Sequence, residues 1–423
     1  MLIHKYNMRK NVEINFKSVL FLGIGGVSMF QLANAFKNLG CNIVGYDAQI
    51  NHNVKLIKQM GVEVYNRFNK AMLNVDLCVK TAGISDNSKL VRILKKHNVR
   101  IVDRAQALSW LCSRFKTVIA VSGTHGKTTT CALIYHILRK AGRSVSCHIG
   151  GEFSGARFNL SDEYLVVEAC EFNKSFLHLY PDICVVTNIE KEHMDCYENI
   201  FNLRYNFIKF LKRGKVTYVY NDKSTSFLKK YKHFHFVSKT ELKLNPQIKG
   251  DYNLRNISVA LRVCSDLGVE EDVAIRAVNS FAGVKRRCEF LGKRNGCKIF
   301  TDYAHHPTEL REFIKSFKQE NGEIQIVFQP HTYSRTETFF KEFVDILKDE
   351  KNVCVFKEYS ARENHAQGKT AKDLFLKLKE SKSDVFYCTT SKQVERCLMD
   401  NVAIAFVGAG DIDQLARSLI KQQ

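Results

Sequence analysis

The sequence predicts an α/β protein of three domains, in which helices cover mainly parallel sheets. Three observations support this fold class. A glycine-rich turn follows a short apolar strand that ends at Leu22, and a second glycine turn follows an apolar strand that ends at Val121. After Gly283, apolar strands alternate with helical stretches, which is typical of a doubly wound sheet. We place the domains at residues 1–113, 114–282 and 283–423.

The composition fits an ordinary α/β enzyme. The 423 residues suffice for two or three cores, and 45% of them are hydrophobic. There is no apolar run of 18 residues, so we expect no membrane span. Residues 1–17 lack the apolar segment of a signal peptide. The 14 cysteines form no Cys-x-x-Cys pair, which argues against zinc or a disulfide framework. We therefore expect a cytoplasmic protein.

The formal net charge is +21. A charge of this size is compatible with nucleic-acid binding, with attraction of anionic substrates, or with a lysine-rich solvated surface. The lysines are spread along the chain, without a basic-aromatic module or a recognisable nucleic-acid fold. We therefore favour a solvated surface, then substrate attraction, and expect no nucleic-acid partner.

The first domain opens with a dinucleotide-type pattern. A strand over residues 17–22 leads into Gly23-Ile24-Gly25-Gly26, and a helix is expected over residues 29–38. The next strand, residues 42–46, ends at Asp47. Such glycines let a pyrophosphate approach the helix end, while the acidic residue can reach a ribose. This predicts a Rossmann-like domain, and NAD is one possible ligand.

The second domain opens with a phosphate-binding pattern. The strand Val118–Val121 leads into Ser122-Gly123-Thr124-His125-Gly126-Lys127-Thr128, and a helix is expected from Thr129 to Lys140. Backbone N–H groups and the helix end would hold phosphate oxygens, Lys127 would meet the outer phosphates, and Thr128 could bind Mg²⁺. The strict spacing of this motif would require glycine in place of Val121. An ordinary βα turn is the alternative.

Polar side chains follow the next two strands of the central domain. Glu168 ends the strand that starts at Tyr164, and Asn188 ends the strand that starts at Ile183. Ligands bind at the carboxyl ends of strands in open α/β sheets, so these side chains should reach the edge that holds Lys127. His193 lies a few residues further on. Hard oxygen ligands with one imidazole suit Mg²⁺ bound to a nucleotide.

The third domain again places polar groups after strands. We expect strands at residues 298–301, 324–329, 353–356, 385–388 and 403–407. Asp302, Tyr303 and His305 follow the first of these strands, and His331 and Arg335 follow the second. Such a set suits an amino acid that must present a neutral amine.

Several segments together resemble the Mur ligase family of ATP-dependent amide-forming enzymes. The resemblance covers residues 19–411, and it is strongest to the members that join L-alanine to UDP-N-acetylmuramate. It is carried by the two glycine loops and by the runs Thr187-Asn188-Ile189-Glu190, Glu192-His193-Met194-Asp195, Asp302-Tyr303-Ala304-His305-His306-Pro307-Thr308-Glu309 and Phe328-Gln329-Pro330-His331.

The resemblance implies an ATP-dependent ligase of peptidoglycan precursor synthesis that uses Mg²⁺, acting as a monomer or homodimer. It assigns the UDP-sugar to the first domain, ATP to the second, and the amino acid and part of the nucleotide to the third. The implied catalytic residues are Lys127, His193, His305, His331 and Arg335. The implied nucleotide-binding residues are Gly123, Thr124, His125, Gly126, Lys127, Thr128, Thr129, Asn188, Asn253, Asn256, Arg286, Arg287 and Asp302. The implied metal ligands are Thr128, Glu168 and His193, and the implied substrate-binding residues are Gly23, Gly25, Gly26, Asp47, Ser85 and Tyr303.

The chain departs from the family pattern at Ser28, Cys170, Asn173, Tyr252 and Thr332. The family usually has arginine at the position of Thr332, where it helps to grip the carboxylate of the incoming amino acid. These departures leave two alternatives open: a Mur-type ligase with another acceptor, such as a peptide-recycling enzyme or specialised paralogue, and a catalytically silent nucleotide-binding relative. A nucleotide oxidoreductase would explain only the first glycine loop.

Overall fold

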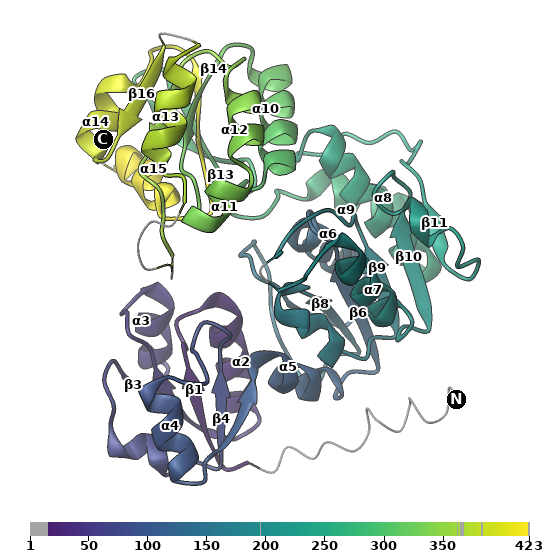
Figure 1. Ribbon diagram of the computed structural model, residues 1–423. Coiled ribbons are helices and arrows are strands. Elements are labelled where there is room, and N and C mark those ends of the chain that lie inside the picture. Colours follow the sequence, from purple (N-terminus) through teal and green to yellow (C-terminus); the bar gives the residue numbers. More distant parts are fainter. Residues whose placement is uncertain (1–15, 195, 362, 364–367, 382–383, 422–423) are drawn as a thin grey trace. The chain divides into compact units, whose positions relative to one another are not determined.

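The computed structural model describes residues 16–194, 196–361, 363, 368–381 and 384–421. Asp195 of the resembling run therefore lies outside the described residues, as do residues 1–15. The chain forms two compact units, and we describe each by itself. One unit comprises residues 1–246 and 255–281, and the other comprises residues 247–254 and 282–423. Together they contain three sheets (Figure 1).

The first sheet is entirely parallel and has the order β3-β2-β1-β4-β5. Its order corresponds to that of a Rossmann-type domain, with the crossover point next to β1. Its strands are β1 (Ser18–Leu22), β2 (Asn42–Tyr46), β3 (Glu63–Tyr65), β4 (Leu77–Lys80) and β5 (Arg100–Asp103), and its helices are α2 (Val27–Asn38), α3 (His52–Gln59), α4 (Lys89–Lys96) and α5 (Arg104–Cys112).

The second sheet belongs to the same unit, is also parallel, and has the order β11-β10-β9-β6-β8-β7. The central position of β6 brings the phosphate-loop segment between the ends of β8 and β9. The strands are β6 (Thr117–Ser122), β7 (Val145–His148), β8 (Tyr164–Glu168), β9 (Ile183–Val186), β10 (Val216–Tyr220) and β11 (His235–Val237). The helices are α6 (Lys127–Lys140), α7 (Ile200–Leu211), α8 (Asp251–Asp266), which runs across the division between the units, and α9 (Glu271–Ser280).

The third sheet lies in the other unit and has the order β12-β13-β17-β14-β15-β16, with only β12 antiparallel to its neighbour. Its strands are β12 (Glu289–Arg294), β13 (Cys297–Asp302), β14 (Ile324–Phe328), β15 (Val353–Phe356), β16 (Val385–Cys388) and β17 (Ala403–Val407). Its helices are α10 (Pro307–Asn321), α11 (Tyr333–Thr338), α12 (Phe340–Leu347), α13 (Ala371–Lys379), α14 (Ser391–Cys397) and α15 (Ile412–Lys421).

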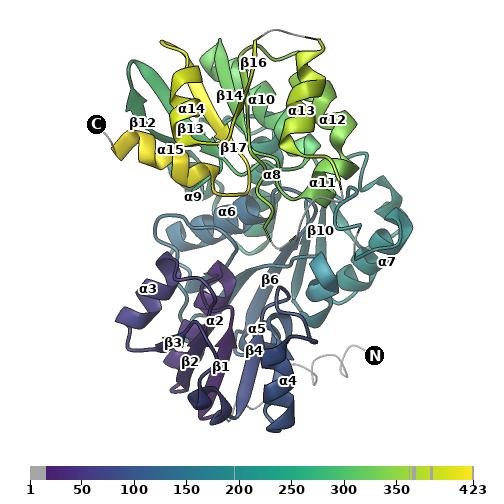
Figure 2. The same cartoon turned by 60° about the vertical axis from the view of Figure 1, so that its left-hand side comes forward.

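Along each strand of the third sheet, alternate side chains point to opposite faces, and each face is covered by a hydrophobic layer. Helices α10, α12 and α13 pack on one face, where Phe313 and Leu374 are buried, and α14 and α15 cover the other, where Val394 and Leu419 are buried (Figure 2). A sheet with helices on both faces must be apolar on both, which explains the continuous apolar runs of its strands.

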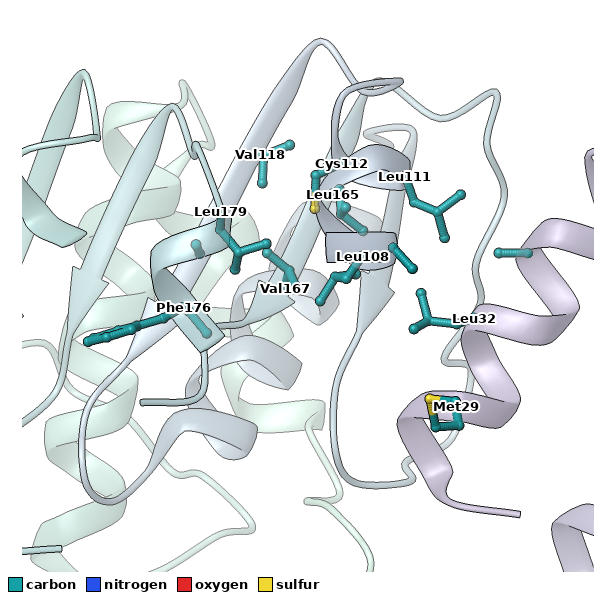
Figure 3. Close-up of a cluster of buried hydrophobic side chains, with 14 of the residues drawn as sticks. Met29, Leu32, Leu108, Leu111, Cys112, Val118, Leu165, Val167, Phe176 and Leu179 are labelled. Carbon is teal, nitrogen blue, oxygen red and sulfur yellow. The ribbon is translucent and has the colours of Figure 1, made fainter. Parts of the chain in front are cut away.

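One buried cluster extends from one face of the first sheet into the second sheet, while the other face of the first sheet has a cluster of its own. Met29 and Leu32 of α2 belong to the same buried cluster as Leu108 and Leu111 of α5 and as Leu165 of β8 (Figure 3). Each of these side chains is no more than 2% exposed. Burial of such side chains contributes about 1.5–3 kcal/mol each. The hydrophobic effect therefore joins the first domain to the central one.

Most of the apolar strands were predicted correctly, often to the residue, but the buried strand β10 and several weaker elements were not anticipated. β2, β8, β15, β16 and β17 have the expected bounds. The short edge strands β3, β5 and β11, and the hairpin strand β12, were not predicted. α6 begins two residues earlier than expected, at Lys127. α5 extends to Cys112, one residue before the boundary proposed after residue 113. No helix among the described residues is long and apolar enough to cross a membrane.

Candidate active site

The loop between β6 and α6 adopts a conformation that only glycine accommodates easily. Gly123 has a φ of +136° and Gly126 a φ of +80°. A Cβ atom at Gly123 would lie 2.0 Å from the Thr187 hydroxyl oxygen, and one at Gly126 would lie 2.3 Å from Asn256 Oδ1. The loop is therefore packed as closely as a phosphate cradle requires, and both glycines are needed sterically.

The segment after β9 fixes the shape of this loop. The His125 N–H donates to Asn188 Oδ1 at 2.8 Å, and Asn188 Nδ2 donates back to the His125 carbonyl at 3.1 Å. The Thr187 hydroxyl donates to the same carbonyl at 2.6 Å. Thr124 exchanges hydrogen bonds with Glu190 through its hydroxyl. The run from Thr187 to Glu190 thus preorganises the phosphate loop.

Lys127 is held in place by the loop and by one carboxylate. Its ammonium group donates to the carbonyls of Gly123 and Thr124 at 2.5 and 3.0 Å, and it lies 3.1 Å from both oxygens of Glu171. Burial opposes the charge, but Glu171, Cys170 and Glu168 together outweigh that effect and raise the pKa of Lys127 above its usual value. Lys127 therefore remains charged at every physiological pH.

Thr128 and Glu168 meet at the carboxyl end of β8. The Thr128 hydroxyl donates to Glu168 Oε2 at 3.0 Å, and the Gly150 N–H donates to the same oxygen at 3.0 Å. Thr128 lies in the first turn of α6, where the positive end of the helix favours anions. A hydroxyl and a carboxylate at this point form a pair of hard oxygen donors of the kind that Mg²⁺ binds.

His193 and Glu171 form a second group beside Lys127. His193 Nε2 lies 3.8 Å from Glu171 Oε1, and His193 adopts a φ of 55°, which is rare for a non-glycine residue. Glu171 is only 1% exposed, and its carboxylate already faces one cation, the Lys127 ammonium, which lies 3.1 Å from both of its oxygens. A buried carboxylate oxygen beside an imidazole fits a cation, so the residues present here match a metal site.

The first glycine loop is held by its own acidic and amide side chains. The Gly25 N–H donates to Asp47 Oδ2 at 2.8 Å, and the side-chain amides of Asn51 and Asn53 both donate to the Gly25 carbonyl at 3.0 Å. Gly23 has a φ of +84° and Gly26 is the N-cap of α2. Asp47 therefore shapes the loop directly, while its Oδ1 accepts the Gln49 N–H.

Ser28 links the first domain to the central one. The Ser28 hydroxyl lies 2.8 Å from His148 Nε2 and accepts a hydrogen bond from Arg104 at 3.0 Å. Burial, together with the positive charge of Arg104, lowers the pKa of His148 to about 3. The imidazole is therefore neutral in the folded protein near neutral pH.

We expect acid to destabilise the first unit through His148. The unfolded chain takes up a proton below its ordinary pKa of 6.5, whereas the folded protein does not until about 3, so the free energy of unfolding falls as the pH decreases through that window. Urea titrations at several pH values should show a shallower decrease for His148→Gln, which cannot be protonated. Parallel pH profiles for both proteins would contradict this assignment.

The third domain brings two predicted histidines and an arginine together. The rings of His305 and His331 have centroids 5.8 Å apart, and an Arg335 guanidinium nitrogen lies 3.0 Å from His331 Nδ1. His305 Nδ1 lies 3.0 Å from the Tyr303 carbonyl and 3.3 Å from Glu309 Oε2. The group can therefore bind a carboxylate at Arg335 and accept or donate a proton at an imidazole.

Thr332 holds the turn between His331 and α11. Its φ is 64°, its N–H donates to the Tyr359 carbonyl at 2.9 Å, and its side-chain oxygen accepts the Arg335 N–H at 3.4 Å. Tyr359 also stacks on His331, with ring centroids 5.7 Å apart. Thr332 is thus an N-cap that orients the helix carrying Arg335, a role its sequence position alone did not reveal.

Arg286, Arg287 and Tyr303 form a cation–π cluster, in which both guanidinium groups lie within 5.0 Å of the tyrosine ring centre. Arg286 also donates to the carbonyls of Gly408 and Gly410 at 3.0 and 2.9 Å, so it holds the loop after β17. Arg287 lies 4.0 Å from Glu309. Both arginines therefore lie at the Tyr303 ring, and Arg286 also supports the loop after β17.

Asp302 ends β13 and is nearly buried, with 5% of the residue exposed. Its two oxygens accept the N–H groups of Cys288 and Ala304, each at 2.7 Å. Burial raises the pKa of Asp302 to about 6, although Arg287 opposes the shift. Asp302 therefore organises the strand end and is partly protonated in mildly acidic solution.

Four other expected site residues, Asn253, Asn256, Thr129 and Ser85, make different kinds of contact. Asn256 contacts the phosphate loop, since Thr130 donates to its Oδ1 at 3.2 Å, but Asn253 donates backward to the Lys249 carbonyl. Thr129 is buried in α6. Ser85 shapes its own turn by accepting the Asn87 N–H at 3.1 Å.

Sequence reasoning missed several residues that the structure places in these groups. They are Glu171 beside Lys127, Asn51 and Asn53 at the first glycine loop, Glu309 beside His305, and Tyr359 on His331. Glu171 could have been found, because it is the second carboxylate of the segment that follows β8. Tyr359 carried no such signal, since its contact depends on pairing between distant segments.

Comparison with known families gives three matches along the chain. Residues 18–116 match the family described as Mur ligase family, catalytic domain, residues 121–233 match the Mur ligase middle domain, and residues 286–410 match the Mur ligase, glutamate ligase domain. The matched ranges follow the three sheets in order.

Curated relatives resemble the chain over nearly its whole length. The UDP-N-acetylmuramate–L-alanine ligase of Caldicellulosiruptor bescii is 33% identical, with 95% of this chain and 98% of the relative covered. The enzyme of that name from Buchnera aphidicola is 32% identical, with 98% of each chain covered.

Solved structures show the same fold. The UDP-N-acetylmuramate–alanine ligase of Thermotoga maritima superposes with a TM-score of 0.83 at 22% identity, covering 96% of this chain and 99% of that one. A murein peptide ligase of Psychrobacter arcticus gives a TM-score of 0.69 at 20% identity, covering 96% and 98% of the two chains.

Proposed function

Because the chain belongs to the Mur ligase family, we propose that it joins L-alanine to the carboxylate of UDP-N-acetylmuramate at the expense of ATP, as a step of peptidoglycan precursor synthesis in the cytoplasm. ATP phosphorylates the carboxylate to give an acyl phosphate and ADP. The amine of the amino acid then attacks the acyl carbon, and inorganic phosphate leaves the tetrahedral intermediate.

Residues of the central domain would carry the phosphoryl transfer. Lys127 places a fixed positive charge in the phosphate loop, and phosphoryl transfer depends mainly on such positioning and charge. Thr128 and Glu168 would hold one Mg²⁺ ion, and His193 with Glu171 would hold another. Bound Mg²⁺ would neutralise charge on the phosphate oxygens.

Residues of the third domain would serve the acceptor and part of the nucleotide. Arg335 would bind the carboxylate of the amino acid, and His305 or His331 would take the proton that the amine must lose. Arg287 would contact phosphate, with Tyr303 and Asp302 shaping the surrounding loop. All of these residues belong to the same compact unit, and their roles are inferred from contacts within that unit.

The observation that carries the proposal is the charged, largely buried side chain of Lys127 in a phosphate loop, paired with Glu171 and close to the Thr128–Glu168 and Glu171–His193 contacts. A catalytically silent relative would not need this set of groups. The decisive experiment is a phosphate-release assay with ATP, Mg²⁺, UDP-N-acetylmuramate and L-alanine. Release should require both substrates. ATP binding without release under any combination of acceptors would favour the silent relative.

We expect the first glycine loop to bind a UDP-sugar in preference to a dinucleotide. The Asp47 carboxylate already accepts a hydrogen bond from the Gly25 N–H. It is therefore poorly placed to accept hydrogen bonds from the ribose hydroxyls of a nicotinamide dinucleotide. Calorimetry should detect UDP-N-acetylmuramate and give no heat with NAD or NADP. Tight dinucleotide binding without a response to the UDP-sugar would overturn the assignment.

We expect the acceptor carboxylate to be bound more weakly than is usual in the family, because Thr332 offers no charge and Arg335 is the nearest cation in this sequence motif. L-Alanine, glycine or L-serine should be the best acceptor in a phosphate-release screen of amino acids and short peptides. Thr332→Arg should lower the KM for L-alanine, since a charge-assisted hydrogen bond is about twice as strong as a neutral one.

The same substitution has a structural cost that must be separated from its effect on KM. Thr332 is the N-cap of α11, and loss of such a cap costs about 1 kcal/mol. Thr332→Ala loses the cap without adding charge and is therefore the control. A KM for L-alanine that is already micromolar and unchanged in Thr332→Arg would contradict the argument. A marked preference for a peptide would instead support the recycling alternative.

We also propose the domain boundaries 1–113, 114–282 and 283–423 and a monomeric or homodimeric state. The boundaries are supported by the sheets, since the first spans residues 18–103, the second 117–237 and the third 289–407. Size-exclusion chromatography with light scattering would determine the oligomeric state.

A further inference from the structure

Four cysteines of the third domain, Cys297, Cys354, Cys388 and Cys397, lie in one hydrophobic layer, on the face of the sheet that α14 and α15 cover. Cys388 is the last residue of β16, and Cys397 is the last residue of α14. Their sulfur atoms are 3.9 Å apart. Cys354 of β15 pairs with Phe386, two residues before Cys388, so it presents its side chain on the same face.

These sulfur atoms differ in exposure and in acidity. Hydrogen bonds from Cys354 and Cys397 lower the pKa of Cys388 to about 7, although burial opposes the shift. Burial and the charge on Cys388 raise the pKa of Cys397 to about 11. Cys354 is fully buried and Cys388 is 1% exposed, whereas Cys397 is partly exposed. A thiolate-forming sulfur is therefore in contact with a more accessible thiol.

We propose that Cys388 and Cys397 are an oxidation site, which a peroxide closes to a disulfide. Two S–H bonds and the peroxide O–O bond break, one S–S bond forms, and two molecules of water leave with the hydrogens. The cysteines lose two electrons and the peroxide gains them. The sulfur atoms must approach by about 2 Å to reach disulfide bond length. Cys397 can move toward Cys388 because it is the last residue of a short helix. Cys354 is held more firmly, because its strand β15 is hydrogen-bonded to β14 on one side and to β16 on the other.

The oxidation site is connected to the proposed acceptor group by one strand end. The Lys357 N–H donates to the Cys388 carbonyl at 2.8 Å. Two residues later, Tyr359 stacks on His331 and its carbonyl accepts the Thr332 N–H. A bond from Cys397 to Cys388 would therefore pull on the end of β16, which is hydrogen-bonded to the segment that supports His331. This second step rests on the proposed function, whereas disulfide formation does not.

Peptide mapping tests the chemistry directly. Lys392 and Arg396 lie between the two cysteines, so trypsin separates them and a disulfide leaves two peptides joined. After treatment of the full-length protein with hydrogen peroxide and blocking of free thiols, the joined peptides should appear and should vanish on reduction. Cys397→Ser should abolish them. Cys297→Ala, in the same layer but hydrogen-bonded to the Met399 carbonyl, should retain them.

Wild-type mapping alone decides the proposal if a variant fails to fold. Overoxidation of Cys397 without a joined peptide, or a disulfide between Cys354 and Cys388, would overturn it. For the coupling, the oxidised enzyme should show a roughly three- to tenfold higher KM for L-alanine, comparable with loss of one hydrogen bond, and reduction should reverse it. Cys397→Ser should be insensitive. Joined peptides with an unchanged KM would refute the coupling, independently of whether the ligase activity is as proposed.

Discussion

Lys127→Ala is expected to lower ATP-dependent product formation by roughly 10²- to 10³-fold, because loss of one preorganised charge raises the barrier by a few kcal/mol. Lys127 is held by the carbonyls of Gly123 and Thr124 and by Glu171, so its charge cannot be replaced by a mobile neighbour. The measurement is phosphate release at saturating ATP and UDP-N-acetylmuramate. Lys140→Ala, at the exposed far end of the same helix, is the matched control and should keep full activity.

Loss of activity must be separated from loss of stability, since Lys127→Ala leaves the buried Glu171 without its ammonium partner. The double variant Lys127→Met, Glu171→Gln removes both charges and keeps the side-chain volumes similar, which is often nearly neutral for a buried ion pair. It should be folded by circular dichroism and remain inactive. Full activity in this variant would refute the phosphate-loop assignment.

Glu171→Ala is expected to lower the free energy of unfolding of the first unit by about 3 kcal/mol, because breaking a buried ion pair leaves an uncompensated charge. Glu171 is 1% exposed and lies 3.1 Å from Lys127, so solvent screens the interaction little. The enzyme should also lose activity, since His193 and Lys127 both lie against this carboxylate. Urea unfolding and phosphate release measure the two effects.

Glu171→Gln separates the charge of this residue from its shape. The amide can still accept a hydrogen bond from Lys127 but cannot neutralise it, so stability should be intermediate between wild type and Glu171→Ala. ATP added with Mg²⁺ should raise the stability of wild type more than that of either variant. Equal stability of all three proteins would show that the ion pair contributes nothing.

The sequence predicted those parts of the fold in which local chemistry is decisive. β8 and β17 are continuous apolar runs, and Gly123 and Gly126 allow a turn that other residues would strain, so both the strands and the phosphate loop could be located from residue order alone. β3 and β11 could not, because these three-residue edge strands depend on pairing with distant neighbours.

The residues of the candidate site were also predicted only in part, and for the same reason. Lys127 and Thr128 were assigned from the phosphate-loop motif and Glu168 from its place at the end of a strand, and the structure places the Thr128 hydroxyl on Glu168. Glu171 and Tyr359 escaped notice because a side chain's partner is set by tertiary packing, which spacing does not encode. For Thr332 the family pattern drew attention to a missing charge, whereas its geometry reveals a helix cap.

The shared core of the first two sheets bears on how such a protein can be dissected or recombined. Excising residues 1–116 would bare Met29, Leu32, Leu108 and Leu111 to water, and the isolated fragment should aggregate. A foreign sugar-recognition module grafted before residue 117 would meet a surface shaped for α2 and α5. Evolutionary exchange at this junction would therefore require both sides to change together, so the first two domains are expected to be inherited as one piece.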